Sequence, residues 1–380
     1  MRVYADNSTT SFPKAKGVSA AMTSFLDATP ANINRGSYTA AYDVGMDVLK
    51  VRQLLCQLFS FDQPKNVVFT PGITYSLNMI LKGFLQNGDH VITSSMEHNG
   101  LMRPLHDLTK NGVTYDIIQA NTEGIFDSKD IAKMIKHNTK MVVMTHASNV
   151  CGTLLPITEI GKICKEYDIK FVLDSAQTAG SLSINMEYID ALCFTAHKGL
   201  LASPGLGGFL IKSDFAKLVN PIITGGTGSA SHELEHPTSM PDKFETGTLN
   251  IPAIIGLKTA LEYILSFKQG ELSGIKMSLT SEFLRQLENI KGLRIVGKKN
   301  TTERVAVVSL DFVDRDNSDV STILDEKFGI MTRCGLHCSP MSHKTLGTYP
   351  QGTVRFSFSH FNTMEEIDYI VRSIKWILNN

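Results

Sequence analysis

The chain has no excess of charge of either sign, few cysteines and no long apolar run. Its 380 residues include 37 Lys and Arg and 37 Asp and Glu, so the formal net charge at pH 7 is zero. No overall field therefore draws in nucleic acid or an anionic membrane, and any ligand must be recognised locally. No apolar stretch approaches the roughly 18 residues that a membrane-spanning helix needs. We expect a soluble, cytoplasmic protein.

Six cysteines in a chain of this length are too few for a disulfide scaffold. Only Cys334 and Cys338 share a polar, loop-like segment. The other four lie in apolar or helix-like surroundings, and we expect them to be inert packing residues: Cys56, Cys151, Cys164 and Cys193. The length itself suggests two domains of about 100–200 residues each and allows a sizeable core.

Short strand-like runs alternate with helix-like stretches through the first part of the chain. The strand-like runs cover residues 66–70, 90–94, 113–118, 141–146, 169–174, 191–195 and 206–211. Helical patterns such as 128–136 and 156–167 lie between them. This alternation predicts a parallel sheet covered by helices. Because such sheets bind ligands at the carboxyl ends of their strands, the residues directly after each strand are the candidates for a site.

The rest of the chain predicts a small α+β domain. Helical patterns at 277–290 and 318–327 alternate with strand patterns at 293–296, 305–312 and 354–359. The last helix opens with Thr363-Met364-Glu365-Glu366, which is a capping box. We therefore predict an N-terminal arm over 1–16, a large domain over 17–254 and a small domain over 255–380. The arm is rich in turn-forming polar residues and could line a site or simply cap the fold.

Polar and titratable residues follow successive predicted strands. They are Glu97-His98-Asn99, Ser148-Asn149, Asp174-Ser175-Ala176-Gln177 and Thr195-Ala196-His197-Lys198. We interpret Lys198 as the reactive centre, because an amine can form a Schiff base with a carbonyl cofactor when burial or a nearby cation lowers its pKa. Alone, a lysine before a glycine is usually a solvated turn residue, so the interpretation depends on the residues around it.

A glycine turn at Pro71-Gly72-Ile73-Thr74 joins the predicted strand 66–70 to a helix. Unpaired backbone N–H groups and the positive end of the helix dipole converge at such a turn, where Thr74 adds a hydroxyl. The turn could therefore bind an anion. An ordinary strand-to-helix connection is the alternative.

Together these positions meet the needs of pyridoxal phosphate. This cofactor requires an amine for its aldehyde, a carboxylate for its pyridine nitrogen and a phosphate cradle, for which Lys198, Asp174 and Thr74 are the candidates. The further candidates are His98 for stacking on the ring, Gln177 and Asn149 for its phenolic oxygen, and Ile73, Thr195 and His197 for the phosphate. Each alone is more often a structural polar group, and their common placement after successive strands supports the prediction.

These motifs, with Ser148-Asn149-Val150-Cys151-Gly152-Thr153, resemble the class V aminotransferase superfamily of fold type I. More narrowly, the chain is similar to the cysteine desulfurase and selenocysteine lyase family, over nearly its whole length. The resemblance implies an α/β fold of two parts. A large domain would hold a mostly parallel seven-stranded sheet, and a small C-terminal α+β domain would carry a catalytic cysteine loop.

Arg333-Cys334-Gly335-Leu336-His337-Cys338 resembles the group II pattern of this family, which puts Cys338 at the persulfide position. A thiolate near His337 and arginines is a competent nucleophile. The resemblance implies catalytic roles for Lys198, Cys338 and His98, and a substrate-carboxylate role for Arg355, whose fork suits that group. It also implies substrate contacts from Arg333, Asn149 and Asn34, and a homodimer in which Gly226 and Thr248 approach the phosphate of the other subunit.

Two alternatives for the cysteine loop stay open at this point. Zinc could be bound by Cys334, His337, Cys338 and His343, although their spacing matches no common finger pattern. A disulfide between Cys334 and Cys338 would be an oxidised state, which a reducing cytoplasm disfavours.

The sequence thus predicts a cysteine desulfurase that converts L-cysteine to L-alanine. Lys198 would remove the α-proton and Cys338 would attack the γ-sulfur to become a persulfide. A selenocysteine lyase, a class V aminotransferase and a non-catalytic relative that binds a partner are the alternatives. The predicted partners are L-cysteine or L-selenocysteine, a second subunit and a sulfur-acceptor protein, with no metal, nucleic acid or membrane.

Overall fold

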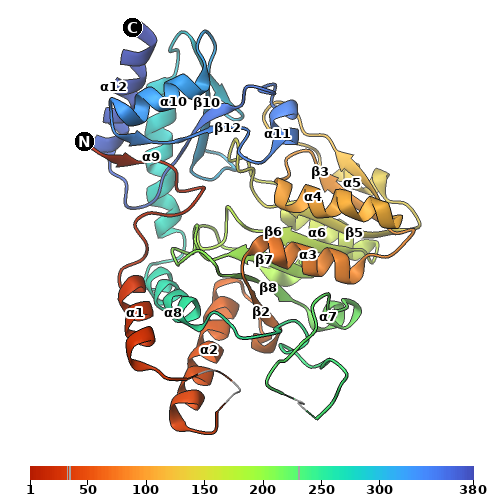
Figure 1. Ribbon diagram of the computed structural model, residues 1–380. Helices are drawn as coiled ribbons and strands as arrows, with labels where there is room; N and C mark the ends of the chain where they lie inside the picture. The colour runs from red at the N-terminus through yellow and green to blue at the C-terminus, as the bar shows by residue number, and fades with distance from the viewer. Residues whose placement is uncertain (32, 34–35, 230–231) are drawn as a thin grey trace.

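A seven-stranded sheet forms the centre of the computed structural model, which describes residues 1–31, 33, 36–229 and 232–380 (Figure 1). The strand order is β2-β8-β7-β6-β5-β3-β4. The strands are β2 (Val67–Thr70), β3 (His90–Ser94), β4 (Thr114–Ile118), β5 (Thr139–Thr145), β6 (Lys170–Asp174), β7 (Ala191–Thr195) and β8 (Gly207–Ile211). Strand β8 runs antiparallel to β2 and β7, and the other pairs are parallel, which confirms the predicted mostly parallel sheet.

Helices cover both faces of this sheet, so its strands are apolar on both sides. One face packs on α3 (Ile73–Phe84), α4 (Asn99–Leu108) and α7 (Ser213–Leu218). The other face packs on α2 (Thr39–Leu58), α5 (Lys129–Met134), α6 (Ile157–Glu166) and α8 (Ile251–Leu265). Alternate residues of one strand enter opposite cores: in β6, Val172 faces the first group of helices, and Phe171 and Leu173 face the second. Helix α1 (Val18–Ala28) packs against α8.

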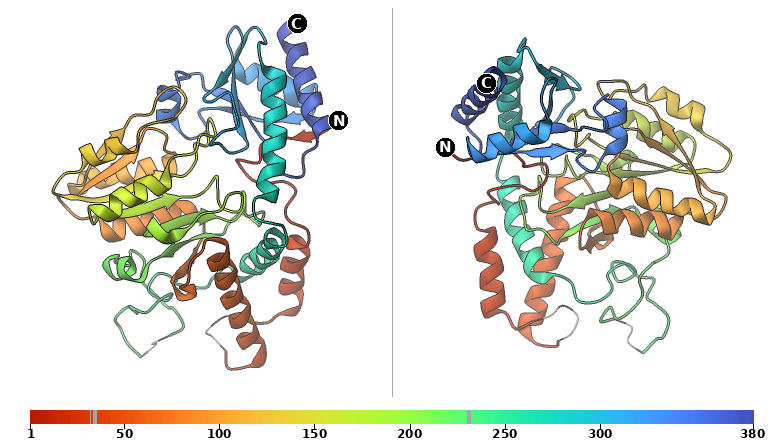
Figure 2. Two further views of the ribbon diagram at one scale, coloured as in Figure 1. Left: turned by 180° about the vertical axis from the view of Figure 1, so that it is seen from behind. Right: turned by 45° about the horizontal axis from the view of Figure 1, so that its top comes forward.

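The C-terminal domain is built on a four-stranded antiparallel sheet of order β12-β13-β10-β9 (Figure 2). Its strands are β9 (Leu293–Val296), β10 (Val307–Phe312), β12 (Arg333–Gly335) and β13 (Thr353–Ser357). Its helices are α9 (Glu271–Leu287), α10 (Asn317–Glu326), α11 (Pro340–Thr345) and α12 (Met364–Asn379). The N-terminal strand β1 (Val3–Tyr4) pairs in parallel with β11 (Ile330–Met331), so the arm begins on this domain. The exact domain boundaries stay a prediction.

Several local predictions are confirmed. Thr363 and Glu366 form the capping box at the start of α12. The four cysteines expected in packing positions are buried, whereas Cys334 is half-buried and Cys338 exposed. Within the part of the chain that the structure describes, no helix is both long and apolar enough to cross a membrane.

A buried ion pair fixes α2 to the edge strand of the large sheet. Arg52 Nη2 lies 2.7 Å from Glu245 Oε2, and both side chains are about 6% exposed. The other carboxylate oxygen of Glu245 accepts a 2.7 Å hydrogen bond from the backbone N–H of Phe69 in β2, and Arg52 donates to the Val67 carbonyl. Glu245 thus anchors the irregular segment that leads to Thr248.

We expect Glu245→Ala to lower the free energy of unfolding by about 3–5 kcal/mol, because it leaves the Arg52 guanidinium buried without its counter-charge. Urea unfolding of the variant and the wild type measures this loss. Asp107→Ala is the matched control, because Asp107 pairs with Lys82 and Lys110 at the surface and its removal should cost far less than the removal of Glu245. Equal losses in the two variants would contradict the structural role of Glu245.

Candidate active site

Lys198 lies in the turn that follows β7, at the carboxyl end of the sheet. Burial lowers the pKa of its amine to about 8; Asp174 opposes this shift, and the charges of Arg355 and Arg333 add to it. Near pH 8 about half of this amine is therefore unprotonated, whereas an ordinary lysine is almost fully charged there. An amine with a lowered pKa is a better nucleophile at neutral pH than an ordinary lysine, which is consistent with the predicted role of Lys198.

The N-terminal arm fixes the peptide that precedes Lys198. The carbonyl oxygen of His197 accepts hydrogen bonds from the Ser11 N–H at 2.8 Å and from Lys14 Nζ at 3.0 Å. It also accepts from the hydroxyls of Thr10 and Ser11, each at 3.1 Å. Sequence reasoning left open whether the arm lines a site or only caps the fold. The structure places it in the site.

Asp174 ends β6 as a buried carboxylate with one backbone hydrogen bond, from Ala176 N–H to Oδ1 at 2.8 Å. Burial raises its pKa, while the Ala176 N–H and Lys198 lower it. A second carboxyl group, that of Glu97, is buried nearby, and its pKa is raised to about 8 chiefly by burial and also by Asp174. Glu97 is therefore mostly protonated at pH 7, whereas the Ala176 N–H and Lys198 favour the charged form of Asp174, the carboxyl group that we predict to hold the ring nitrogen.

His98 caps the start of α4, where its Nδ1 accepts a 2.8 Å hydrogen bond from the Gly100 N–H. Burial, followed by the charges of Lys198, Arg333 and Arg355, lowers its pKa to about 4. The ring is therefore neutral at pH 7 and carries its proton on Nε2. A flat, uncharged ring beside Lys198 suits the predicted stacking role.

The start of α4 lies close to the start of α3, where the sequence predicts an anion site. A Cβ added at Gly100 would lie 3.5 Å from Thr74 Oγ1 and 3.0 Å from His98 Nδ1. The first N–H groups of α3 that donate to a backbone carbonyl within the helix are those of Tyr75 and Ser76, which donate to the Gly72 carbonyl. Ile73 and Thr74 come before them, at the positions where a helix leaves its N–H groups without an internal acceptor. Their N–H groups are the ones that a helix start offers to a phosphate.

The other predicted cofactor residues lie at the same end of the sheet or in the loop beyond it. Thr195 is buried at the end of β7. Burial, and then the charges of Lys198 and Lys14, lower the pKa of His197 to about 4. Gln177 Nε2 donates to the Ser8 carbonyl at 3.3 Å. A bond from Gly247 N–H to the Gly226 carbonyl brings Gly226 beside Thr248. The predicted substrate contact Asn34 lies outside the described residues.

Cys338 is exposed on a loop between β12 and α11, with Arg333 Nη2 3.3 Å from its Sγ. Its own carbonyl accepts a 2.8 Å bond from Asn99 N–H, beside His98. His337 and Cys338 have φ of 50° and 59°, a left-handed conformation that costs a non-glycine residue about 1–2 kcal/mol. The surrounding contacts thus hold the thiol in a conformation that the isolated loop would not favour.

Asn149 holds this loop with both ends of its side-chain amide. Its Nδ2 donates to the His337 carbonyl at 2.8 Å, and its Oδ1 accepts from Ser339 Oγ at 2.7 Å. We expected the amide to contact cofactor and substrate, which stays a prediction. The two contacts show that Asn149 also positions the Cys338 loop, because His337 and Ser339 are the residues on either side of Cys338.

Arg355 is fully buried on β13. Its Nη2 bonds Asp6 Oδ1 and Thr9 Oγ1, both at 2.9 Å, and its Nη1 bonds the Asn149 carbonyl at 3.0 Å. The buried Nε has no hydrogen-bond partner among the described residues, so the Nε–H and the second N–H of Nη1 are the donors left for a substrate carboxylate. Arg333 donates to Thr9 Oγ1 and to Cys338 Sγ, each at 3.3 Å, and its contact with substrate stays a prediction.

The zinc hypothesis for the cysteine loop lacks the required geometry. His337 Nε2 and His343 Nδ1 bond the hydroxyls of Thr353 and Thr348, at 2.9 Å and 2.7 Å. Across residues 1–31, 33, 36–229 and 232–380, no three His, Cys, Asp or Glu side chains are grouped to hold a metal. All six cysteines are unpaired in this structure, including Cys334 and Cys338.

The donor set as a whole fits pyridoxal phosphate. A partly unprotonated amine, a buried carboxyl group beside it, a neutral imidazole and a helix start with a hydroxyl all lie at one edge of the sheet. Each group matches one part of the cofactor: the aldehyde, the ring nitrogen, the ring face and the phosphate. These features alone do not distinguish one reaction of this cofactor from another.

Comparison with known proteins agrees with this chemistry. Residues 3–370 match the family model described as aminotransferase class-V. A protein of Pyrococcus abyssi named a probable cysteine desulfurase is 30% identical, over 96% of this chain and 92% of its own length. A probable cysteine desulfurase of Methanothermobacter thermautotrophicus is 29% identical, over 99% and 94%.

Solved structures give the same result. The apo structure of a cysteine desulfurase from Thermococcus onnurineus has a TM-score of 0.93 and 29% identity, and the match covers 100% of this chain and 95% of that one. A cysteine desulfurase from Escherichia coli has a TM-score of 0.89 and 25% identity, with the same coverage. With a family match over nearly its whole length and a fold shared from end to end, the chain belongs to the class-V aminotransferase family.

Proposed function

We propose that this protein is a pyridoxal-phosphate-dependent cysteine desulfurase, which converts L-cysteine to L-alanine and takes the sulfur as a persulfide on Cys338. The observation that carries the proposal is the exposed Cys338 thiol, 3.3 Å from Arg333, whose charge also acts on Lys198. A simple amino transfer needs no thiol beside the arginine that acts on the reactive lysine. The names of the similar proteins support the same reaction.

Pyridoxal phosphate, when bound, supplies an aldehyde that takes up amino groups and a ring that withdraws electrons from the α-carbon. Asp174 would hold its ring nitrogen and His98 would cover its face. The remaining residues that we propose to hold it are Ile73, Thr74, Asn149, Gln177, Thr195 and His197, with Gly226 and Thr248 from a second subunit of a homodimer.

The side chains of this chain divide the remaining work. Arg355 binds the substrate carboxylate through the N–H groups that Asp6, Thr9 and Asn149 leave open, which are the Nε–H and the second N–H of Nη1. Lys198 removes the α-proton, a task for which a pKa of about 8 is well matched to neutral solution.

Cys338 then takes the sulfur atom. Its anionic sulfur attacks the Sγ of the substrate and forms the new sulfur–sulfur bond. The carbon–sulfur bond breaks with its electron pair on carbon, which gains a proton to become the methyl group of alanine. Because Cys338 is exposed, the terminal sulfur can pass to the thiol of an acceptor protein.

The proposal is tested by supplying the cofactor-loaded protein with L-cysteine, with L-selenocysteine, and with L-alanine plus a 2-oxo acid. We expect one alanine for each sulfur released from cysteine, and no amino transfer to the oxo acid. Turnover of selenocysteine alone would contradict the desulfurase in favour of a selenocysteine lyase. Amino transfer without sulfur release would indicate an aminotransferase.

A further inference from the structure

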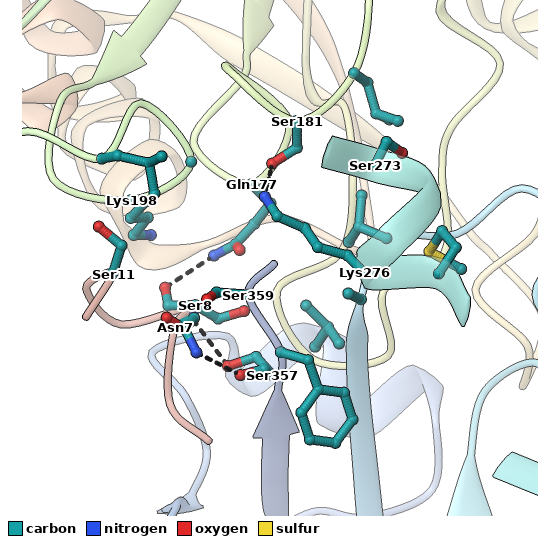
Figure 3. A pocket seen from close by; sticks show the side chains of 18 of the residues that line it. Asn7, Ser8, Ser11, Gln177, Ser181, Lys198, Ser273, Lys276, Ser357 and Ser359 are labelled. Atoms are coloured by element: carbon teal, nitrogen blue, oxygen red, sulfur yellow. Dashed lines mark hydrogen bonds between the residues drawn. The ribbon is translucent and has the colours of Figure 1, made fainter. Parts of the chain in front are cut away.

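A cavity of about 50 Å³ lies on the side of Lys198 that faces α9 (Figure 3). It is lined by residues of the arm, of the segment after β6, of α9 and of the segment after β13. Figure 3 shows the Lys276 side chain reaching from α9 toward Ser181, with Gln177 and Lys198 beyond it. A cavity needs about 10–15 Å³ to admit one water molecule, so this one has room for a few atoms but not for an amino acid or a cofactor.

Lys276 lies in this cavity without a counter-charge. The residue is 8% exposed, and Ser181 Oγ, at 2.9 Å, is the only hydrogen-bond partner of its side chain among the described residues. An ammonium group has three N–H donors, so two remain to be satisfied. Burial lowers its pKa to about 8, which still leaves most of the group charged at pH 7.

The groups around Lys276 are neutral or positive. They are the hydroxyls of Ser181 and Ser273, the imidazole of His360 and, at the far side of the cavity, the amine of Lys198. Burial and then the charge of Lys276 lower the pKa of His360 to about 4, so His360 is neutral at pH 7. No carboxylate in the described chain pairs with Lys276, whereas Asp6 pairs with Arg355 and Glu245 with Arg52. A buried charge without compensation is costly, so the site favours an anion from solution.

Two hydroxyls that line the cavity can donate to such an anion. Ser181 Oγ accepts from Lys276, and Ser359 Oγ accepts from the Phe361 N–H at 3.0 Å. Neither hydroxyl donates its own proton to another described residue, so both protons are available to a ligand in the cavity. An ammonium group and hydroxyl donors around a small cavity are suited to a halide.

We infer that the cavity beside Lys276 binds a single monovalent anion of about the size of chloride. The anion would join Lys276 of α9 to Ser181, which follows the large sheet, and so fix α9 against the large domain. The inference concerns stability and is independent of the proposed desulfurase reaction. Neither of its tests uses cysteine turnover.

Crystals of the cofactor-loaded protein grown in bromide test the inference directly through anomalous scattering. We expect a bromide peak within hydrogen-bonding distance of Lys276 Nζ, which Lys276→Met removes and Lys82→Met retains, because Lys82 lies at the surface. Wild-type crystals with no anomalous peak at Lys276, and only water in the cavity, would overturn the inference.

The second test compares thermal unfolding in sodium chloride and in sodium gluconate of equal ionic strength. For the wild type we expect a higher midpoint in chloride, by roughly 2 °C or more at saturation, because only the folded state binds the anion. The difference should disappear in Lys276→Met. Equal midpoints for the wild type in the two salts would overturn the inference even if the variant did not fold.

Discussion

Replacement of Cys338 by alanine is expected to lower the release of sulfide and alanine from L-cysteine by at least about 10³-fold, as the loss of a covalent nucleophile does in other enzymes. The methyl group of alanine cannot accept the sulfur, and no other exposed thiol lies among the six cysteines. Rates of product release with the cofactor-loaded variant measure this loss. Binding of the cofactor should not change, because Cys338 belongs to the C-terminal domain and not to the predicted cofactor set.

Cys334→Ala is the matched control for this experiment. Cys334 lies on β12 in the same loop region, half-buried, and burial raises the pKa of its thiol, which makes it a poor nucleophile. Its replacement should leave sulfide release close to that of the wild type. Unchanged sulfide release in Cys338→Ala would remove Cys338 from the mechanism and, with it, the persulfide.

Replacement of Lys198 by alanine is expected to abolish turnover of cysteine. It should also abolish the absorbance band near the visible edge that we expect when pyridoxal phosphate is bound to the Lys198 amine. The amine is the only group that we assign to the cofactor aldehyde, and loss of a general base alone lowers rates by about 10²–10⁴-fold. Absorption spectra of the purified variant with added pyridoxal phosphate measure the first effect. An intact band in Lys198→Ala would contradict the assignment.

Lys212→Ala is the control for Lys198. Lys212 also follows a strand of the large sheet, β8, but its Nζ bonds the Glu187 carbonyl at the surface. Its removal should leave the band in place. In the cofactor-free wild type, capture of the aldehyde should become faster as the pH rises through about 8, because the unprotonated amine is the reactive form.

The large sheet could be predicted because its strands are short, apolar on both faces and separated by helices. In β6, Phe171, Val172 and Leu173 are all buried, and such a run reads as a strand regardless of what packs on it. The sequence of helix α4 does not indicate a helix in the same way. It contains Pro104 and starts from a histidine cap, so neither its composition nor its first residue is typical of a helix.

The reactive part of the site could be predicted because Asp174 and Lys198 each follow directly from a strand. The contacts that position Cys338 could not. Asn149 and Ser339 are 190 residues apart, and Asp6 and Arg355 are 349 apart, so no local pattern indicates that either pair will meet. The arm itself shows only a run of turn-forming polar residues before any periodic segment. That run is equally compatible with an arm that caps the fold, so it does not predict the contacts with the His197 carbonyl and Arg355.

The central claim is that sulfur from cysteine becomes bound to Cys338. Mass spectrometry of the peptide that contains Cys338, taken after a single turnover of the loaded protein with L-cysteine and without added reductant, tests it most directly. We expect one additional sulfur atom on Cys338 and an equal amount of alanine in solution. Alanine formed with no sulfur on this peptide, or with the sulfur on another cysteine, would contradict it.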